Sequence, residues 1–170
     1  GMNRILEQYL DEHVWPKLPG QRRKLAISML SLLVAAARER EAPGKVRLAV
    51  EVLAGGGHEH SRSCRDVLAK LVDLRLLHRH SDDQGQVSYE IVHDYFHQYF
   101  SAHFEETRDA ATSRLELRIA IRQFERDGEL LSWRQLRRYR KLFDGEDPDM
   151  NAAAMLFIRS RWRLGKDQSF

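Results

Sequence analysis

Cysteine is nearly absent from this chain of 170 residues, and Cys64 is the single example. One cysteine cannot form an internal disulfide or supply a multi-cysteine zinc site, and it fits a reducing compartment. We expect Cys64 to be a buried structural thiol, because no base is evident beside it in the sequence. With 42% hydrophobic and 31% charged residues, and without repeats or low-complexity tracts, the composition is that of a folded globular protein.

Long apolar runs are also missing. The longest run, 26–37, is interrupted by Ser28 and Ser31 and falls short of the roughly 20 residues that a membrane-spanning helix needs. The opening segment, GMNRILEQYLDEH, is acidic and amphipathic, which is unlike a signal peptide. Gly1 before Met2 has the form of a scar left by tag cleavage. We therefore expect a cytoplasmic chain that contacts no membrane.

The chain lacks a strong charge of one sign. Its 28 basic and 25 acidic residues leave a formal net charge of +3. This balance allows nucleic-acid binding without requiring it. The positions of the charges therefore matter more than their sum.

Motifs for nucleotide hydrolysis and serine catalysis are absent. The segment APGKV at 42–46 has a Gly-Lys pair but lacks the first glycine and the Ser/Thr of a phosphate-binding loop. The glycine run at 55–57 leads into a histidine rather than a lysine, and no GxSxG occurs. We predict that the chain is not an enzyme, holds no cofactor of its own, and neither binds nor hydrolyses ATP well.

Apolar periodicity predicts a mainly α-helical chain. Two short segments, 76–81 and 86–92, alternate as strands and flank the turn sequence DDQG at 82–85, which predicts a β-hairpin. Helices are expected at 3–15 (ended by Pro16), 21–40, 46–54 (entered through a stub of strand), 61–77, 95–107 with a continuation through 126, 133–143, and 150–162.

Several residues are expected to fix the helix ends. Ser61 or Ser63 is predicted to cap the helix that follows the glycine run, and Asp94 the helix after the hairpin. Ser132 is predicted to cap the helix 133–143. Gly165 is predicted to end the last helix.

The order helix, helix, helix, hairpin between residues 21 and 92 predicts a winged helix. The long helix 21–40 would pack across the other two helices, and the hairpin would be the wing. We expect a winged-helix domain with its N-terminal helix at 2–106 and a C-terminal helical extension at 107–170.

The segment YEIVHDYFHQYF at 89–100 carries the most information about function. A predicted strand delivers His93 and Asp94 to the start of a helix. At 100° per residue, Phe96, His97 and Phe100 fall within about 60° of His93, as does residue 104. We therefore predict that His93 opens a mostly aromatic helix face, with the Asp94 carboxylate near the free N–H groups of the helix start.

In this context Val92-His93-Asp94 resembles the methionine-histidine-aspartate motif of STAND-class NTPases, a family of signal-transducing switch ATPases. The stretch YEIVHD at 89–94 is similar to the form common in bacterial members. The segments 67–72 and 74–77 resemble the helix that precedes the wing in this family. The segments 124–131 and 156–165 resemble the helical region that follows it.

The resemblance implies a non-enzymatic regulatory module. In such proteins the histidine of the motif contacts the diphosphate of bound ADP and holds the closed, inactive state, a role that would fall on His93. Asp94 would cap the helix and fix the backbone. The implied partner is an NTPase domain of the same or a cognate protein, ADP or ATP belongs to that domain alone, and activation is compatible with oligomerisation. The other interpretation of His93 is a core histidine at a strand–helix junction.

A DNA-binding winged-helix regulator is the alternative function, because a winged helix places its third helix in the major groove. Acidic Asp82 and Asp83 at the wing tip, and Asp66 and Asp73 on the third helix, oppose this interpretation. We expect at most non-specific, salt-sensitive DNA binding. The candidate DNA contacts are Arg62, Arg65, Lys70 and Arg79.

Metal binding has weak support. His93 and His97 form an HDxxH pattern, but Asp replaces the usual Glu and no third ligand is evident. The pairs His58/His60 and His78/His80 are more typical of solvated loops and strands. We predict no metal site.

Arginines are frequent in the second half of the chain. Four of them recur every fourth residue and predict a solvated helix face, partly paired with Glu116, Glu125 and Glu129. The other interpretation is a docking surface for a partner domain or RNA. The stripe consists of Arg114, Arg118, Arg122 and Arg126, and the following helix carries Arg134, Arg137, Arg138, Arg140 and Lys141.

Overall fold

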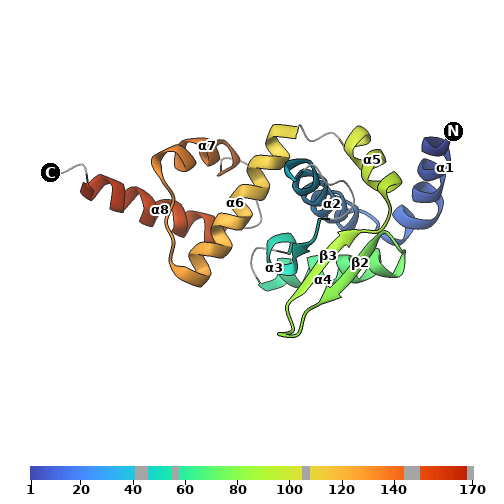
Figure 1. The fold of residues 1–170 in the computed structure, drawn as a ribbon, viewed down its shortest axis with the longest axis horizontal. Coiled ribbons are helices and arrows are strands. Elements are labelled where there is room, and N and C mark those ends of the chain that lie inside the picture. Colours follow the sequence, from blue (N-terminus) through green and yellow to red (C-terminus); the bar gives the residue numbers. More distant parts are fainter. Residues whose placement is uncertain (41–45, 55–57, 105–107, 144–149, 168–170) are drawn as a thin grey trace.

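The computed structural model describes residues 1–40, 46–54, 58–104, 108–143 and 150–167. Within them the fold is mainly helical, with a small antiparallel sheet (Figure 1). No helix in these ranges is long and apolar enough to cross a membrane. The elements are α1 (Met2–Tyr9), the π-helical turn η1 (Leu10–Val14), the 3-10 turn η2 (Trp15–Lys17), α2 (Gln21–Glu39), β1 (Leu48–Ala49), α3 (Val50–Leu53), α4 (His58–Asp73), β2 (Leu77–Ser81), β3 (Val87–Ile91), α5 (Asp94–His103), α6 (Arg108–Asp127), α7 (Trp133–Phe143) and α8 (Met150–Asp167).

The predicted hairpin is confirmed. Strands β2 and β3 pair antiparallel, and β1 adds to the other edge of β3, with Leu48 opposite Tyr89. The Asp82 carboxylate accepts the backbone N–H groups of Gln84 at 2.9 Å and Gln86 at 2.8 Å. Gly85 takes a φ of +78°, which residues with a side chain rarely adopt. The turn chemistry of this short segment therefore fixes the hairpin locally.

Helix α2 forms the centre of the fold. It is buried along most of its length and packs against α4, α5 and α6. The N-terminal helix joins the same core, because the Tyr9 hydroxyl donates to the Leu74 carbonyl at 2.9 Å. Pro16 lies inside the η2 turn rather than ending a regular helix, and π-helical and 3-10 turns replace the second half of the expected 3–15 helix.

Buried apolar side chains of the described residues form two clusters that meet on α6. The first extends from Leu6 to Leu115, and the second from Leu117 to Phe157. The chain is elongated, with α7 and α8 at one end and α1 and α5 at the other (Figure 1). One helix thus contributes to both cores, its first half to the N-terminal cluster and its second half to the C-terminal one.

Several predicted helix ends are wrong. Helix α4 begins at His58, so Ser61 and Ser63 lie inside it rather than capping it. It ends at Asp73, where Arg75 takes a left-handed φ of 61° and the N–H of residue 76 bonds to the carbonyl of residue 71 at 3.0 Å. This geometry is a Schellman cap with arginine in the place that glycine usually takes. Gly165 lies inside α8.

The start of α7 follows the sequence prediction. The Ser132 hydroxyl accepts the Gln135 N–H at 3.3 Å, and the Gln135 side chain accepts the Ser132 N–H at 2.9 Å. This reciprocal pair is a capping box. The predicted bounds 133–143 are confirmed.

Candidate functional site

The backbone is well fixed where β3 passes into α5. Val92 donates its N–H to the Leu76 carbonyl at 3.1 Å, and the His93 carbonyl accepts the N–H groups of Phe96 at 3.1 Å and His97 at 3.2 Å. His93, with an extended backbone, is therefore the N-cap of α5. The prediction that Asp94 caps the helix is wrong: Asp94 is the first helical residue, and no side chain caps this end. Its carboxylate still lies at the positive end of the helix dipole.

Side chains at the start of α5 differ sharply in burial. His93, Asp94 and Tyr95 are exposed, whereas Phe96 and His97 are 8% and 6% exposed. The His93 ring lies 6.1 Å from the Phe96 ring, at the edge of the aromatic core. His93 therefore does not open a buried face, and the core-histidine interpretation describes His97 instead.

The predicted aromatic face of α5 is buried. Phe96, Phe100 and Phe104 stack in sequence, with ring centroids 6.0 and 4.9 Å apart. Tyr99, predicted to lie outside this face, is also buried. Burial and, to a lesser degree, the nearby Arg38 guanidinium lower the pKa of His97, against the opposing effects of Asp94 and a hydrogen bond to the Val34 backbone. His97 is thus a neutral core residue near neutral pH.

The histidine pairs do not assemble a metal centre. His93 points to solvent and His97 into the core, so the HDxxH pattern does not bring two imidazoles to one ion. His80 is hydrogen-bonded to Glu90, and the ring of His78 lies 6.2 Å from that of His80. The side chain of His58 lies outside the described residues. No group of three potential metal ligands occurs among the residues that the structure describes.

The candidate DNA contacts lie on two elements. Arg62 and Arg65 are exposed on α4, Lys70 is half-buried on the same helix, and Arg79 is exposed on β2. The Arg65 Nε lies 3.4 Å from the Ser61 hydroxyl. The acidic residues weighed against DNA, Asp66, Asp73, Asp82 and Asp83, are exposed as well. Exposed positive and negative side chains therefore occur together on α4 and on the hairpin.

Cys64 is buried, as predicted, with 1% of its surface exposed. A residue that sequence reasoning missed lies beside it: the His60 Nε2 is 3.3 Å from the Cys64 Sγ. The two are four residues apart on α4, so helical spacing could have revealed the pair. The burial of the thiol keeps it from a substrate.

The prediction that the arginine face of α6 is solvated is wrong for Arg114 and Arg118. The Arg114 guanidinium donates to the Ser28 hydroxyl and, at 3.0 Å, to the Ser28 carbonyl on α2. Arg118 is 5% exposed. Arg122 lies 4.0 Å from Glu51 of α3, while Arg126 pairs with its exposed neighbour Asp127 at 3.2 Å. Arg114 and Arg122 thus join α6 to α2 and α3, because an arginine can bury its aliphatic stem while its head group contacts a polar partner.

Glu116 pairs with α7 rather than with the stripe. Its carboxylate lies 3.2 Å from the Arg138 guanidinium and accepts the Tyr139 hydroxyl at 3.2 Å. Burial and this carboxylate together raise the pKa of Tyr139 to about 12. Arg138 and Tyr139 thus help to hold α7 against α6.

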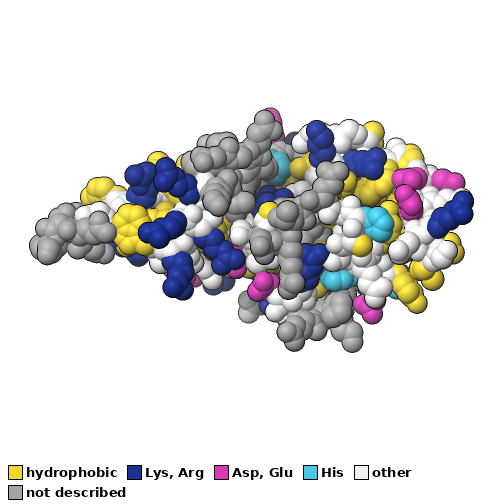
Figure 2. All heavy atoms as spheres, turned by 90° about the horizontal axis from the view of Figure 1, so that it is seen from above, with side chains coloured by type: hydrophobic (Ala, Val, Ile, Leu, Met, Phe, Trp, Pro, Cys, Tyr) yellow, Lys and Arg dark blue, Asp and Glu magenta, His cyan; other side chains and the backbone are white. Residues whose placement is uncertain are grey.

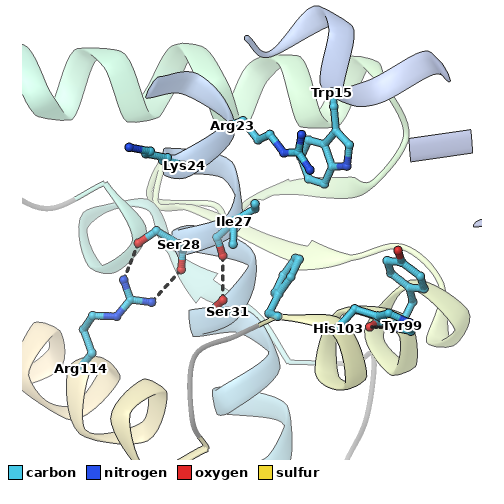
Figure 3. A pocket seen from close by; sticks show the side chains of 10 residues that line it. Trp15, Arg23, Lys24, Ile27, Ser28, Ser31, Tyr99, His103 and Arg114 are labelled. Atoms are coloured by element: carbon cyan, nitrogen blue, oxygen red, sulfur yellow. Dashed lines mark hydrogen bonds between the residues drawn. The ribbon is translucent and has the colours of Figure 1, made fainter. Parts of the chain in front are cut away.

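A cavity of about 580 Å³ lies where η2, α2, α5 and α6 meet, and sequence reasoning did not predict it (Figure 3). The Arg23 guanidinium lies over the Trp15 ring, 4.9 Å from its centroid. The His103 and Tyr99 rings stack at 4.1 Å on the opposite side. Residues from four separate segments form this cavity, so no local sequence pattern indicates it. Its lining includes Trp15, Arg23, Lys24, Tyr99, Phe104 and Arg114.

An apolar patch lies on α8. Ile158 and Trp162 are 63% and 66% exposed, and they line a shallow cavity with Leu130, Arg159 and Arg163. Figure 2 shows basic side chains around apolar ones at this end of the molecule.

Comparison with known proteins adds no assignment. No family model, no curated protein and no solved structure matches the chain. The resemblance of residues 89–94 to the STAND motif therefore rests on the sequence itself. Function has to be argued from the surfaces described above.

Proposed function

We propose that this chain is a non-enzymatic regulatory winged-helix module that contacts the ADP-bound NTPase domain of a STAND-class switch protein through His93. The observation that carries this proposal is the exposure of His93 on a junction whose backbone is fixed by hydrogen bonds on both sides. A core histidine could not reach a second domain. An exposed ring on a fixed backbone can contact a partner without an ordering cost for the backbone.

The order of the elements supports the winged-helix interpretation. Helix α2 is followed by strand β1, helices α3 and α4, and the hairpin β2–β3. The short strand β1 pairs with β3, which ties the start of α3 to the wing. Helix α4 packs its apolar face, including Val67, Leu68 and Leu71, into the core and turns its charged face outward. In this interpretation His93, between β3 and α5, would lie at the base of the wing.

The chemistry of His93 suits a phosphate contact. A neutral imidazole donates one N–H to a phosphate oxygen, and an imidazolium adds a positive charge. Among the described residues, the His93 ring contacts the Phe96 ring and makes no side-chain hydrogen bond, so contact with a phosphate would break none of theirs. Asp94 sits at the first helical position, where its carboxylate stabilises α5.

The test requires the NTPase domain together with this chain. A phosphate-binding loop encoded upstream of Met2, or in a neighbouring gene, would identify the partner. In the combined protein, His93→Ala removes one hydrogen bond to a charged group, which should speed the release of a fluorescent ADP analogue by about ten- to a hundredfold. His78→Ala, at an exposed histidine of β2, is the matched control. Unchanged ADP release in His93→Ala, or an equal effect of His78→Ala, would contradict the proposal.

DNA binding remains the second candidate, and one observation favours it. Arg62, Arg65 and Arg79 are all exposed, on α4 and on the first strand of the wing. The Asp82 carboxylate is used by the turn of the wing, and Asp83 remains exposed at the tip, where a phosphate would have to approach. Like-charge repulsion at this point reduces affinity for DNA of any sequence.

A further inference from the structure

We propose that the cavity between η2, α2, α5 and α6 binds a small anion carried on a flat ring system, such as an aromatic carboxylate or a nucleoside monophosphate. The proposal is independent of the regulatory function proposed above, because His93 does not line this cavity. The two ideas can therefore fail separately.

The size and walls of the cavity suit a planar organic molecule. A volume of about 580 Å³ lies within the range of small-molecule sites, which is roughly 300–1,000 Å³. Three aromatic side chains, Trp15, Tyr99 and Phe104, line it together with the aliphatic Ile27. Aromatic walls favour a flat ring, because offset stacking and edge-to-face contacts add to the burial of apolar surface.

The charged side chains among the described lining residues, Arg23, Lys24 and Arg114, are all basic. Arg23 and Lys24 come from the first turn of α2, and Arg114 approaches from α6 (Figure 3). None of the lining residues that the structure describes is acidic. Positive side chains gathered on one concave surface raise the local concentration of anions and favour an anionic ligand over a neutral one.

Arg23 is the residue best placed to hold the anion. Its guanidinium lies over the Trp15 ring at 4.9 Å, a contact that restrains the side chain in the lining of the cavity (Figure 3). A guanidinium stacked on a ring keeps its in-plane N–H donors for an oxyanion, and these donors match a carboxylate or a phosphate in two-point contact. Trp15 would thus position Arg23 and also present an apolar surface to the ring of the ligand.

Arg114 has a structural role, because it joins α6 to the side of α2 that lines the cavity. It donates to the hydroxyl and the carbonyl of Ser28, and the Ser31 hydroxyl donates to the Ile27 carbonyl at 2.8 Å. These hydrogen bonds help to fix the part of α2 that lines the cavity. We therefore assign anion binding to Arg23 and Lys24, with Arg114 contributing charge from a fixed position.

The experiment uses the complete chain and titration calorimetry with three probes. 1-Naphthoate and adenosine monophosphate carry an anion on a flat ring, and 1-naphthalenemethanol is the neutral counterpart of the first. We expect one or both anions to bind, and the alcohol to bind at least tenfold more weakly than 1-naphthoate. The stronger anion identifies the source of the ligand as a carboxylate or a nucleotide.

Two neighbouring arginines provide a matched comparison. Arg23→Ala should weaken binding of the anion by about ten- to a hundredfold, the effect of losing a hydrogen bond to a charged group. Arg22→Ala removes the same charge from an exposed position outside the lining and should change affinity less than threefold. Lys24→Ala is the second variant if Arg23→Ala melts below the assay temperature, and it should also weaken binding.

Three results would overturn the proposal. The first is that neither anion binds at millimolar concentration. The second is that the neutral alcohol binds as tightly as 1-naphthoate, which would make the cavity a non-selective apolar gap. The third is that Arg22→Ala weakens binding as much as Arg23→Ala or Lys24→Ala, which would reflect overall charge rather than this site.

Discussion

Two histidines four residues apart on one segment should respond differently to alanine substitution. His97 is 6% exposed, packs beside α2 and hydrogen-bonds to the Val34 backbone. Its removal leaves a cavity beside α2, so we expect a loss of about 2–4 kcal/mol in the free energy of unfolding. His93 is exposed, and its backbone hydrogen bonds survive in alanine. We expect His93→Ala to change stability by about 0.5 kcal/mol or less.

These energies convert into melting temperatures that are easily separated. In chains of this size, 1 kcal/mol shifts the melting temperature by roughly 2–4 °C. His97→Ala should therefore melt about 4–16 °C below the wild type, and His93→Ala within about 2 °C of it. Melts followed by far-ultraviolet circular dichroism near pH 8, with denaturant midpoints as a second measure, provide the assay. The pH is chosen above the ordinary pKa of histidine so that protonation does not contribute.

A large loss of stability in His93→Ala would refute this reasoning. A drop equal to that of His97→Ala would mean that the His93 ring is part of the domain core. The proposed contact with a nucleotide-binding partner would then lose the observation that carries it. A small drop in both variants would instead mean that His97 is less well packed than its burial indicates.

Three further predictions concern acid, arginine and DNA. Burial lowers the pKa of His97 below its ordinary 6.5, so the His97 imidazole binds a proton more readily in the unfolded chain than in the folded one. The stability due to neutral His97 is thus present above pH 6.5 and lost as pH falls through the lowered pKa, and melts from pH 8 to 5 should show a smaller acid loss in His97→Ala. Arg114→Ala should lower stability by about 1–3 kcal/mol in denaturant titrations, against about 0.5 or less for exposed Arg126→Ala. Gel shifts should show only salt-sensitive DNA binding; a sequence-selective shift at physiological salt, lost in Arg62→Ala/Arg65→Ala, would favour the DNA-binding alternative.

Structure that is fixed by neighbouring residues could be predicted from the sequence. The hairpin follows from a turn in which Asp82 and Gly85 supply the side-chain acceptor and the unusual φ. The start of α7 follows from the reciprocal bonds of Ser132 and Gln135. In both places the residues that determine the geometry lie within four positions of each other, so a reader of the sequence sees all of them.

Helix ends that depend on the tertiary structure could not be predicted in this way. Arg75 takes a left-handed conformation that usually favours glycine, because the buried Leu74, Leu76 and Leu77 on either side fix the path of the chain. Gly165 continues α8, although glycine commonly ends a helix. Propensity is a weak preference that packing overrides at such positions.

The role of the arginine stripe depended on information that the sequence does not contain. A repeat every four residues predicts one helix face, but it does not say whether that face meets solvent or another helix. Ser28, the partner of Arg114, lies 86 positions away in the chain. The cavity beside it has the same origin, since its walls come from elements that meet only when α6 packs on α2.

The count of helix angles that placed His93 on the aromatic face failed for a more specific reason. Counting 100° per residue assumes that every residue counted is helical. His93 has φ −124° and ψ 142°, which is extended backbone, so the direction of its side chain does not follow the 100° step of a helix. That step applies only from Asp94 onward. Counted from Asp94 onward, the buried side is centred between Phe96 and Phe100 and extends to His97 and Tyr99. The extended backbone at His93 makes the 100° count invalid there, and it also turns the His93 ring away from the core. The same local geometry therefore explains both the failed count of helix angles and the exposure of His93.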